Sequence, residues 1–190
     1  MASDVKMGSN HGGRWRVAGW GIAVLALAMP FIAMQFTSEV MWTGADFIFA
    51  AGLIGGVGLL FELTVRLSDN KAYRAGVGLA LAASFLTIWA TGAVGMIGDE
   101  GNPLNLMFGG VLLIALLGGS LAGFRAGGMA RAMAVAAAAQ LLASTIGSFT
   151  DLRGGIFSAM FAAIWLASAA MFRRAGSESG KAMPKFQVRR

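Results

Sequence analysis

The chain has 190 residues, of which 57% are hydrophobic and only 13% are charged, with a formal net charge of +6. Soluble domains carry about a quarter charged residues, so this composition excludes an ordinary soluble protein and predicts an all-α, polytopic membrane helix bundle. The absence of cysteine excludes disulfides, thiolate catalysis and cysteine-ligated metals. The one histidine lies in the polar N-terminal stretch, whereas a haem-carrying membrane bundle needs axial histidines inside its helices. We therefore expect no cofactor and no resident metal.

The first apolar segment follows a polar stretch at the N-terminus. Residues 1–13 are polar and rich in Gly and Ser, which predicts a disordered cytoplasmic tail. Residues 17–36 are long enough to span a membrane, and Pro30 should kink that helix. An alternative is a cleaved secretory signal, with residues 26–28 (Ala-Leu-Ala) as the cleavage site. Hydrophobicity continues beyond that site, which favours the span.

Two pairs of glycines spaced four residues apart predict close helix packing. Gly52 and Gly56 lie in the second span, at residues 43–65, and Gly119 and Gly123 lie in a later one. In membranes, such pairs let the backbone of another helix approach closely. We expect all four glycines to lie at helix–helix contacts.

An acid and a base lie one turn apart near the end of the second span. Glu62 precedes Arg66 by four residues, a spacing that lets the two side chains pair on one helix face. A carboxylate at membrane depth is a functional-site hypothesis by default. The partner and the position near the membrane boundary favour a structural ion pair.

Polar side chains recur at helical spacing in the third span, at residues 73–97, and in the fifth span, at residues 129–149. Such stripes have to face protein or water, so they indicate either packing contacts or the wall of a permeation path. The stripe residues are Ser84, Thr87 and Thr91 in the third span and Gln140, Ser144 and Ser148 in the fifth.

Residues 91–105 connect the third span to a fourth span at residues 104–124. Gly98 is expected to end the third helix in a left-handed conformation. Asn102 followed by Pro103 is a typical helix start, because Asn caps free N–H groups and Pro fits the first helical position.

Paired carboxylates lie in the same stretch, just before the expected helix start. The simpler interpretation is a turn whose charges hold it at the membrane interface. The alternative is a cation or substrate site built from Asp99, Glu100, Asn102 and Asn105, although the spacing matches no standard calcium loop.

Residues 91–105, together with Glu62, Arg66 and the run Gly-Met-Ala-Arg at residues 128–131, resemble a family of small, uncharacterised bacterial integral membrane proteins. The resemblance covers residues 42–140. That family has no established activity, so the resemblance implies location in a bacterial membrane and no catalytic residue.

The basic residues predict how the chain crosses the membrane. A sixth span at residues 154–172 precedes a basic tail at residues 175–190, so the six-span domain covers residues 14–174. With six spans, 14 of the 15 basic residues fall on one side, and Arg153 is the exception. Basic residues stay inside, which predicts a protein of the bacterial inner membrane with both termini in the cytoplasm.

Three functions remain open from the sequence. The favoured one is a non-catalytic accessory or scaffold module that assembles through its small-residue helix faces, as a homo-oligomer or with another membrane protein. The second is a small-solute or ion transporter that uses the two polar stripes. The third, an enzyme at the outer face using Asp99 and Glu100, lacks a nucleophile with a partner, so we expect no enzyme. Anionic lipid, rather than nucleic acid, is the expected partner of the basic tails.

Overall fold

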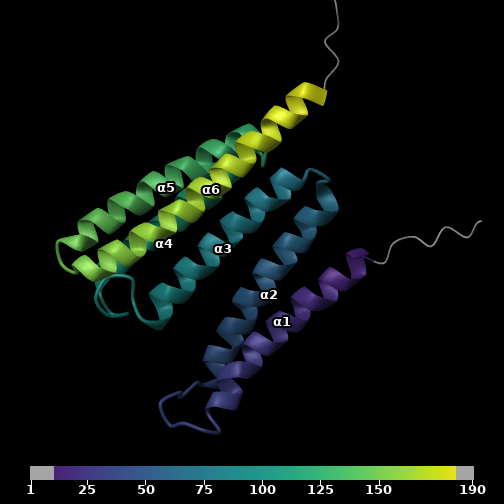
Figure 1. The fold of residues 1–190 in the computed structure, drawn as a ribbon. Helices are drawn as coiled ribbons and strands as arrows, with labels where there is room; N and C mark the ends of the chain where they lie inside the picture. Colours follow the sequence, from purple (N-terminus) through teal and green to yellow (C-terminus); the bar gives the residue numbers. More distant parts are fainter. Residues whose placement is uncertain (1–10, 183–190) are drawn as a thin grey trace, which may run out of the picture. The chain divides into compact units, whose positions relative to one another are not determined.

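The computed structural model describes residues 11–182, which form six long α-helices and contain no strand. All six are long and apolar enough to cross a membrane, which confirms the prediction of an all-α bundle with six spans (Figure 1). The helices are α1 (His11–Ala33), α2 (Gly44–Leu67), α3 (Lys71–Ala93), α4 (Leu106–Leu121), α5 (Ala126–Ser148) and α6 (Leu152–Ala182), and a short 3-10 helix, η1 (Pro103–Asn105), precedes α4.

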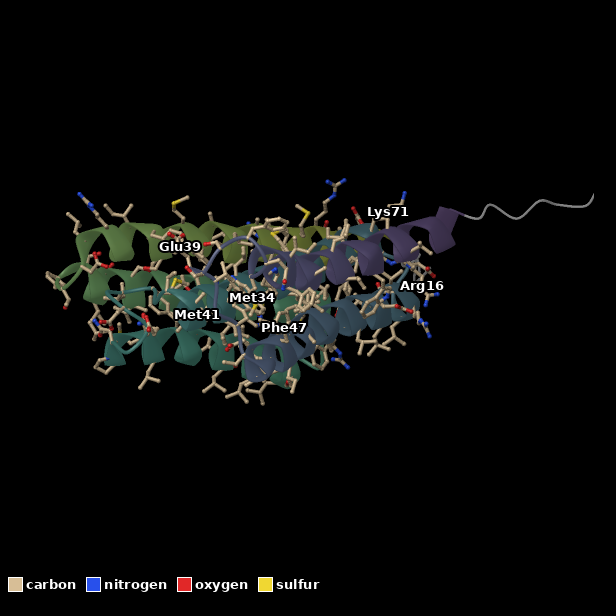
Figure 2. All side chains as sticks on the ribbon, turned by 90° about the horizontal axis from the view of Figure 1, so that it is seen from below. Arg16, Met34, Glu39, Met41, Phe47 and Lys71 are labelled. Carbon is tan, nitrogen blue, oxygen red and sulfur yellow. The ribbon has the colours of Figure 1, made fainter. Side chains whose placement is uncertain are left out.

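The chain divides into two compact units, with the boundary inside α2. The N-terminal unit ends at Leu60 and contains α1 and most of α2. Phe47 holds the start of α2 in place through edge-on ring contacts with Phe31 and Trp42, at centroid distances of 6.5 and 5.1 Å. Most side chains that project from the helices end in carbon or sulfur (Figure 2), as expected of surfaces that face lipid.

The C-terminal unit begins at Phe61 and is built around α6. Helix α6 packs on α3 and α5, and α5 also packs on α4 (Figure 1). The core includes the fully buried side chains of Trp165, Phe172 and Met133. Helix α5 is rich in alanine along its buried face, so neighbouring helices approach it closely.

Of the four glycines predicted to pack, the structure shows a close contact for Gly119. Gly119 is buried, and a Cβ added there would lie 3.1 Å from the sulfur of Met129. For Gly123 the prediction is wrong: it lies beyond α4 with φ 56° and forms the turn into α5. A Cβ on Gly52 or Gly56 would have no atom of residues 11–182 within 4 Å, so their packing against a partner stays a prediction.

Several predicted boundaries differ from those in the structure. Residues 11–13, expected in a disordered tail, belong to α1, while the rest of that tail lies outside the described residues. Helix α3 ends at Ala93, four residues before the predicted end. Helix α6 continues to Ala182, well past the predicted end at residue 172, and the last part of the basic tail (183–190) again lies outside the described residues.

The added length of α6 contains an ion pair and a buried alanine. Arg174 and Glu178 form an ion pair at 3.1 Å with the four-residue spacing that stabilises a helix. Ala175 is 1% exposed, so the extension still packs on the bundle after the apolar span has ended. Hydropathy alone does not detect such a segment.

Candidate functional site

The connection from α3 to α4 contains the predicted site, and we call residues 94–105 the acidic turn. Two glycines with positive φ shape it, Gly95 at 78° and Gly98 at 67°. A Cβ on Gly95 would clash with the backbone of Asp99, so only glycine fits there. Between them, Met96 and Ile97 are 1% and 0% exposed and fill the core instead of continuing the helix. Gly98 is therefore left-handed as predicted, but it does not end α3.

Asn105 is the centre of the acidic turn. It is 4% exposed, and its Oδ1 accepts hydrogen bonds from the N–H groups of Met96 and Ile97, both at 2.9 Å. Its Nδ2 donates to the carbonyls of Asp99 at 2.7 Å and Ile97 at 3.3 Å. One amide side chain thus satisfies four backbone groups of a loop that forms no regular structure.

Asp151, in the connection between α5 and α6, holds the acidic turn from outside. Its carboxylate accepts hydrogen bonds from the N–H of Gly154 and the N–H of Gly98, both at 3.0 Å. The first of these bonds caps α6. The Gly154 N–H, followed by the Gly98 N–H, lowers the pKa of Asp151 below its ordinary value. The sequence signal was an acid just before a helix start, which predicts a cap but not the contact with Gly98.

The other predicted site residues are less constrained. Asp99 and Glu100 are exposed, as expected at an interface. Asn102 caps η1 by accepting a hydrogen bond from the Leu104 N–H at 3.0 Å, which confirms the predicted helix start.

The hydrogen bonds within the acidic turn bear on the cation hypothesis. The side-chain oxygens of Asn102 and Asn105 accept backbone N–H groups, so of the four predicted ligands only the two carboxylates are free to bind a cation. Over residues 11–182, no group of three His, Cys, Asp or Glu side chains could hold a metal ion. The geometry favours a rigid structural turn.

The lowered pKa of Asp151 predicts an acid-dependent contribution to stability. In the unfolded chain an aspartate has a pKa of about 3.9, so the stabilisation is complete above that pH and is lost as pH falls through the lower folded pKa. We expect Asp151→Asn to lower the melting temperature at pH 7. The difference in melting temperature between variant and wild type should narrow below about pH 4. Thermal unfolding in detergent between pH 7 and 3 measures this difference. A difference that stays constant across the range would contradict the role of the charge.

The polar stripe on α5 is buried against α6. Gln140 is fully buried, and its Nε2 donates to the carbonyl of Ser158 at 2.9 Å. The Ser158 hydroxyl donates to the Ser144 hydroxyl at 2.8 Å, and both side chains are at most 2% exposed. Ser148 bonds back to the carbonyl of Ser144. Sequence reasoning missed Ser158, because a lone serine in an apolar helix carries no signal of its own.

Over residues 11–182, only some of the hydroxyl groups in the polar stripe on α3 have hydrogen-bond partners. Ser84 donates to the carbonyl of Ala80 at 2.9 Å. Thr87 is 1% exposed, and neither its hydroxyl nor that of Thr91 has a partner in the part of the chain described. Helix α3 packs mainly on α6, as α5 does.

The predicted pair near the end of α2 is present. Arg66 donates to Glu62 at 2.5 Å, and the acid is the more buried partner, with 16% of its side chain exposed against 64% for the arginine. This geometry agrees with a structural ion pair at a membrane boundary.

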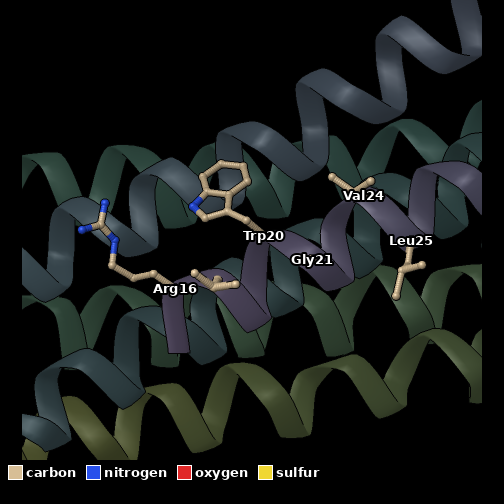
Figure 3. Close-up of a pocket in the computed structure, with 6 residues that line it drawn as sticks. Arg16, Trp20, Gly21, Val24 and Leu25 are labelled. Atoms are coloured by element: carbon tan, nitrogen blue, oxygen red, sulfur yellow. The ribbon is translucent and has the colours of Figure 1, made fainter. Parts of the chain in front are cut away.

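A groove on α1 is the other concave feature of note. It is lined by apolar side chains and by Arg16 at one end (Figure 3), the residues being Arg16, Val17, Trp20, Gly21, Val24 and Leu25. Its lining holds no carboxylate, hydroxyl or thiol.

Comparison with known proteins identified no match among family models, curated proteins or solved structures. The resemblance of residues 42–140 to a bacterial membrane protein family therefore stays a prediction.

Proposed function

We propose that this chain is a non-catalytic accessory or scaffold module of the bacterial inner membrane. The observation that carries the proposal is the closed interface between α5 and α6, where Gln140, Ser144 and Ser158 are buried and bond to one another. Polar groups that line a permeation path have to reach water, whereas these hold two helices together.

The surface that we assign to assembly is the glycine face of α2. Gly52 and Gly56 share this face, and a side chain there would meet open space. In a membrane, a small-residue face of this kind lets a second helix approach closely enough for backbone packing. A second copy of the chain is the simplest occupant.

Disulfide cross-linking tests this assembly, because the chain has no cysteine of its own. We expect Gly52→Cys, oxidised in native membranes, to form a disulfide-linked dimer. Ile54→Cys is the matched control, since it lies about 200° around the same helix. Dimer formation at Ile54 equal to that at Gly52, or at neither position, would overturn assembly through this face.

We also propose that both termini lie in the cytoplasm. This rests on the placement of 14 of the 15 basic residues on one side of six spans. Reporter fusions placed after Glu100 and at the C-terminus should report from opposite sides of the membrane. A C-terminal fusion that reports from the outer side would overturn the orientation.

Transport of a small polar solute or ion is the second candidate function. Four buried polar atoms have no hydrogen-bond partner over residues 11–182: the hydroxyls of Thr87 and Thr91, the Gln140 Oε1 and the Trp165 Nε1. Unpaired polar groups at membrane depth are costly and often mark a solute pathway. Flux of potassium, chloride or glycerol into proteoliposomes, abolished by Gln140→Leu, would support transport over the scaffold function.

A further inference from the structure

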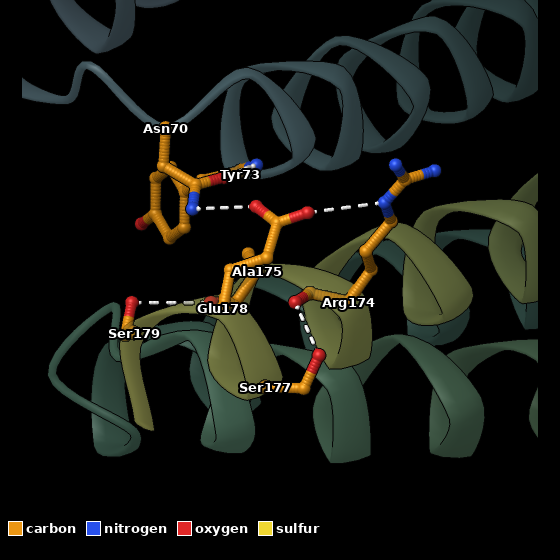
Figure 4. Close-up of polar contacts among 7 residues, drawn as sticks. All are labelled: Asn70, Tyr73, Arg174, Ala175, Ser177, Glu178 and Ser179. Atoms are coloured by element: carbon orange, nitrogen blue, oxygen red, sulfur yellow. Dashed lines mark hydrogen bonds and ion pairs between the residues drawn. The ribbon is translucent and has the colours of Figure 1, made fainter. Parts of the chain in front are cut away.

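Three segments meet at one end of the C-terminal unit. The Tyr73 hydroxyl, at the start of α3, donates to the carbonyl of Phe124, in the turn between α4 and α5, at 2.7 Å. The Asn70 amide donates to Glu178, near the end of α6, at 3.1 Å (Figure 4). A Cβ on Gly176 would lie 3.8 Å from the Gly127 nitrogen. Residues 62–74, 122–131 and 173–179 therefore form one surface, which we call the basic end.

The carboxylates at the basic end are all engaged with a cation. Glu62 binds Arg66, and Asp69 binds Arg74 at 3.2 Å. Glu178 binds Arg174 at 3.1 Å (Figure 4). The second oxygen of Glu178 accepts the Asn70 amide. The three carboxylates of this surface therefore form ion pairs with three of its seven cations.

The remaining four cations are exposed and make no ion pair within the part of the chain described. Each lies close along the chain to one of the contacts that join the three segments. They are Lys71, beside Asn70; Arg125, beside Phe124; Arg131, one turn after Gly127; and Arg173, three residues before Gly176. Four uncompensated positive charges on one surface attract an anion.

Exposed apolar side chains border these cations. Leu121 is 89% exposed and Phe124 is 57% exposed, and both come just before Arg125. They lie where a membrane-spanning helix ends, at the depth at which lipid headgroups meet acyl chains. A free phosphate would use only the cations, whereas a phospholipid would use the cations and the apolar rim.

We propose that the basic end is a binding surface for anionic phospholipid, with the phosphate at Arg125 and Arg131 and an acyl chain along Leu121 and Phe124. Lys71 and Arg173 extend the positive field around it. The opposite end of the unit carries three carboxylates, at residues 99, 100 and 151, and a single base, Arg153. The proposal does not depend on the scaffold function, because it rests on charge and contacts within this unit.

The test compares lipids and variants on the full chain purified in a neutral detergent. We expect phosphatidylglycerol to raise the melting temperature of the wild type and phosphatidylcholine to leave it nearly unchanged. Each cation is worth about fivefold in affinity for an anionic lipid, so Arg125→Gln with Arg131→Gln should weaken phosphatidylglycerol binding by about 25-fold. Arg153→Gln, at the opposite end, removes one charge and should leave binding unchanged.

Other outcomes would overturn the proposal. Equal binding by the double variant and the wild type would remove the two arginines from the site. Equal stabilisation by phosphatidylcholine would show that charge plays no part, and equal stabilisation by inorganic phosphate would rule out a lipid-specific surface. Arg125→Lys with Arg131→Lys keeps both charges and controls for misfolding. If the double Gln variant binds weakly because it has lost charge, the double Lys variant should bind phosphatidylglycerol within severalfold of the wild type.

Discussion

Replacing Asn105 with alanine should lower the free energy of unfolding by about 3–5 kcal/mol, because four buried or partly buried backbone groups would lose their only side-chain partner. Each group left without a partner costs about 1–3 kcal/mol, and water entering the turn would recover part of that cost. Asn105→Asp is a second variant, since it keeps the acceptor for Met96 and Ile97 and removes the donor. Equilibrium unfolding in mixed micelles measures both losses.

Two variants in the same turn provide controls. Asn102→Ala removes one helix cap and should cost about 1 kcal/mol. Asp99→Asn combined with Glu100→Gln should cost less than about 0.5 kcal/mol, because both side chains are exposed. If Asn105→Ala cost no more stability than Asn102→Ala, Asn105 would not be the centre of the acidic turn. If a divalent cation stabilised the wild type and not the double variant, the cation-site hypothesis would be correct after all.

The six spans were predictable because span length and hydropathy are local properties of the sequence. The cap at Asn102 was predictable for the same reason, since its partner lies two residues away. The end of α3 was not, because Met96 and Ile97 are as apolar as any span residue and are buried, yet they are not helical. Hydropathy reports that a residue avoids water and does not report its backbone conformation.

The roles within the acidic turn depend on contacts distant in sequence. Asp99 and Asp151 are both acids in short connections, but only Asp151 reaches across to Gly98, 53 residues away. Asn105 was singled out as an oxygen donor for a cation, whereas its oxygen serves the backbone. Residue type therefore predicted which side chains matter in this turn, and only the fold shows what each of them binds.

Glycine spacing also failed to predict which glycines make close contacts. A four-residue spacing aligns glycines on one face of a helix but says nothing about whether another helix lies there. Glycines that do make close contacts outside the predicted pairs include Gly118 with Ala132, Gly128 with Ala122 and Gly155 with Ser148. They are determined by where helices α4, α5 and α6 cross, which depends on the whole bundle.

Gly155, at the start of α6, is a helical position where an added side chain should be strongly destabilising. A Cβ there would lie 2.8 Å from the Cα of Ser148, closer than real Cβ atoms are found, and the obstacle is backbone that cannot rotate away. The start of α6 would have to move off α5, which would strain the bonds from Ser158 to Ser144 and from Gln140 to Ser158. We expect Gly155→Ala to cost about 2–3 kcal/mol and Gly155→Leu to leave little folded protein.

Two glycines with open surroundings are the matched controls for that result. Gly92→Ala, near the end of α3, should leave stability unchanged or raise it by about 0.5–1 kcal/mol, because alanine favours a helix and meets no neighbour. Gly56→Leu should leave the fold of the single chain intact and act only on assembly, since a Cβ there has no neighbour within 4 Å in the described part of the chain. Monodispersity and thermal unfolding in detergent distinguish these effects. If Gly56→Leu unfolded the chain and Gly155→Leu did not, the close contact between α5 and α6 would not be what holds the bundle together.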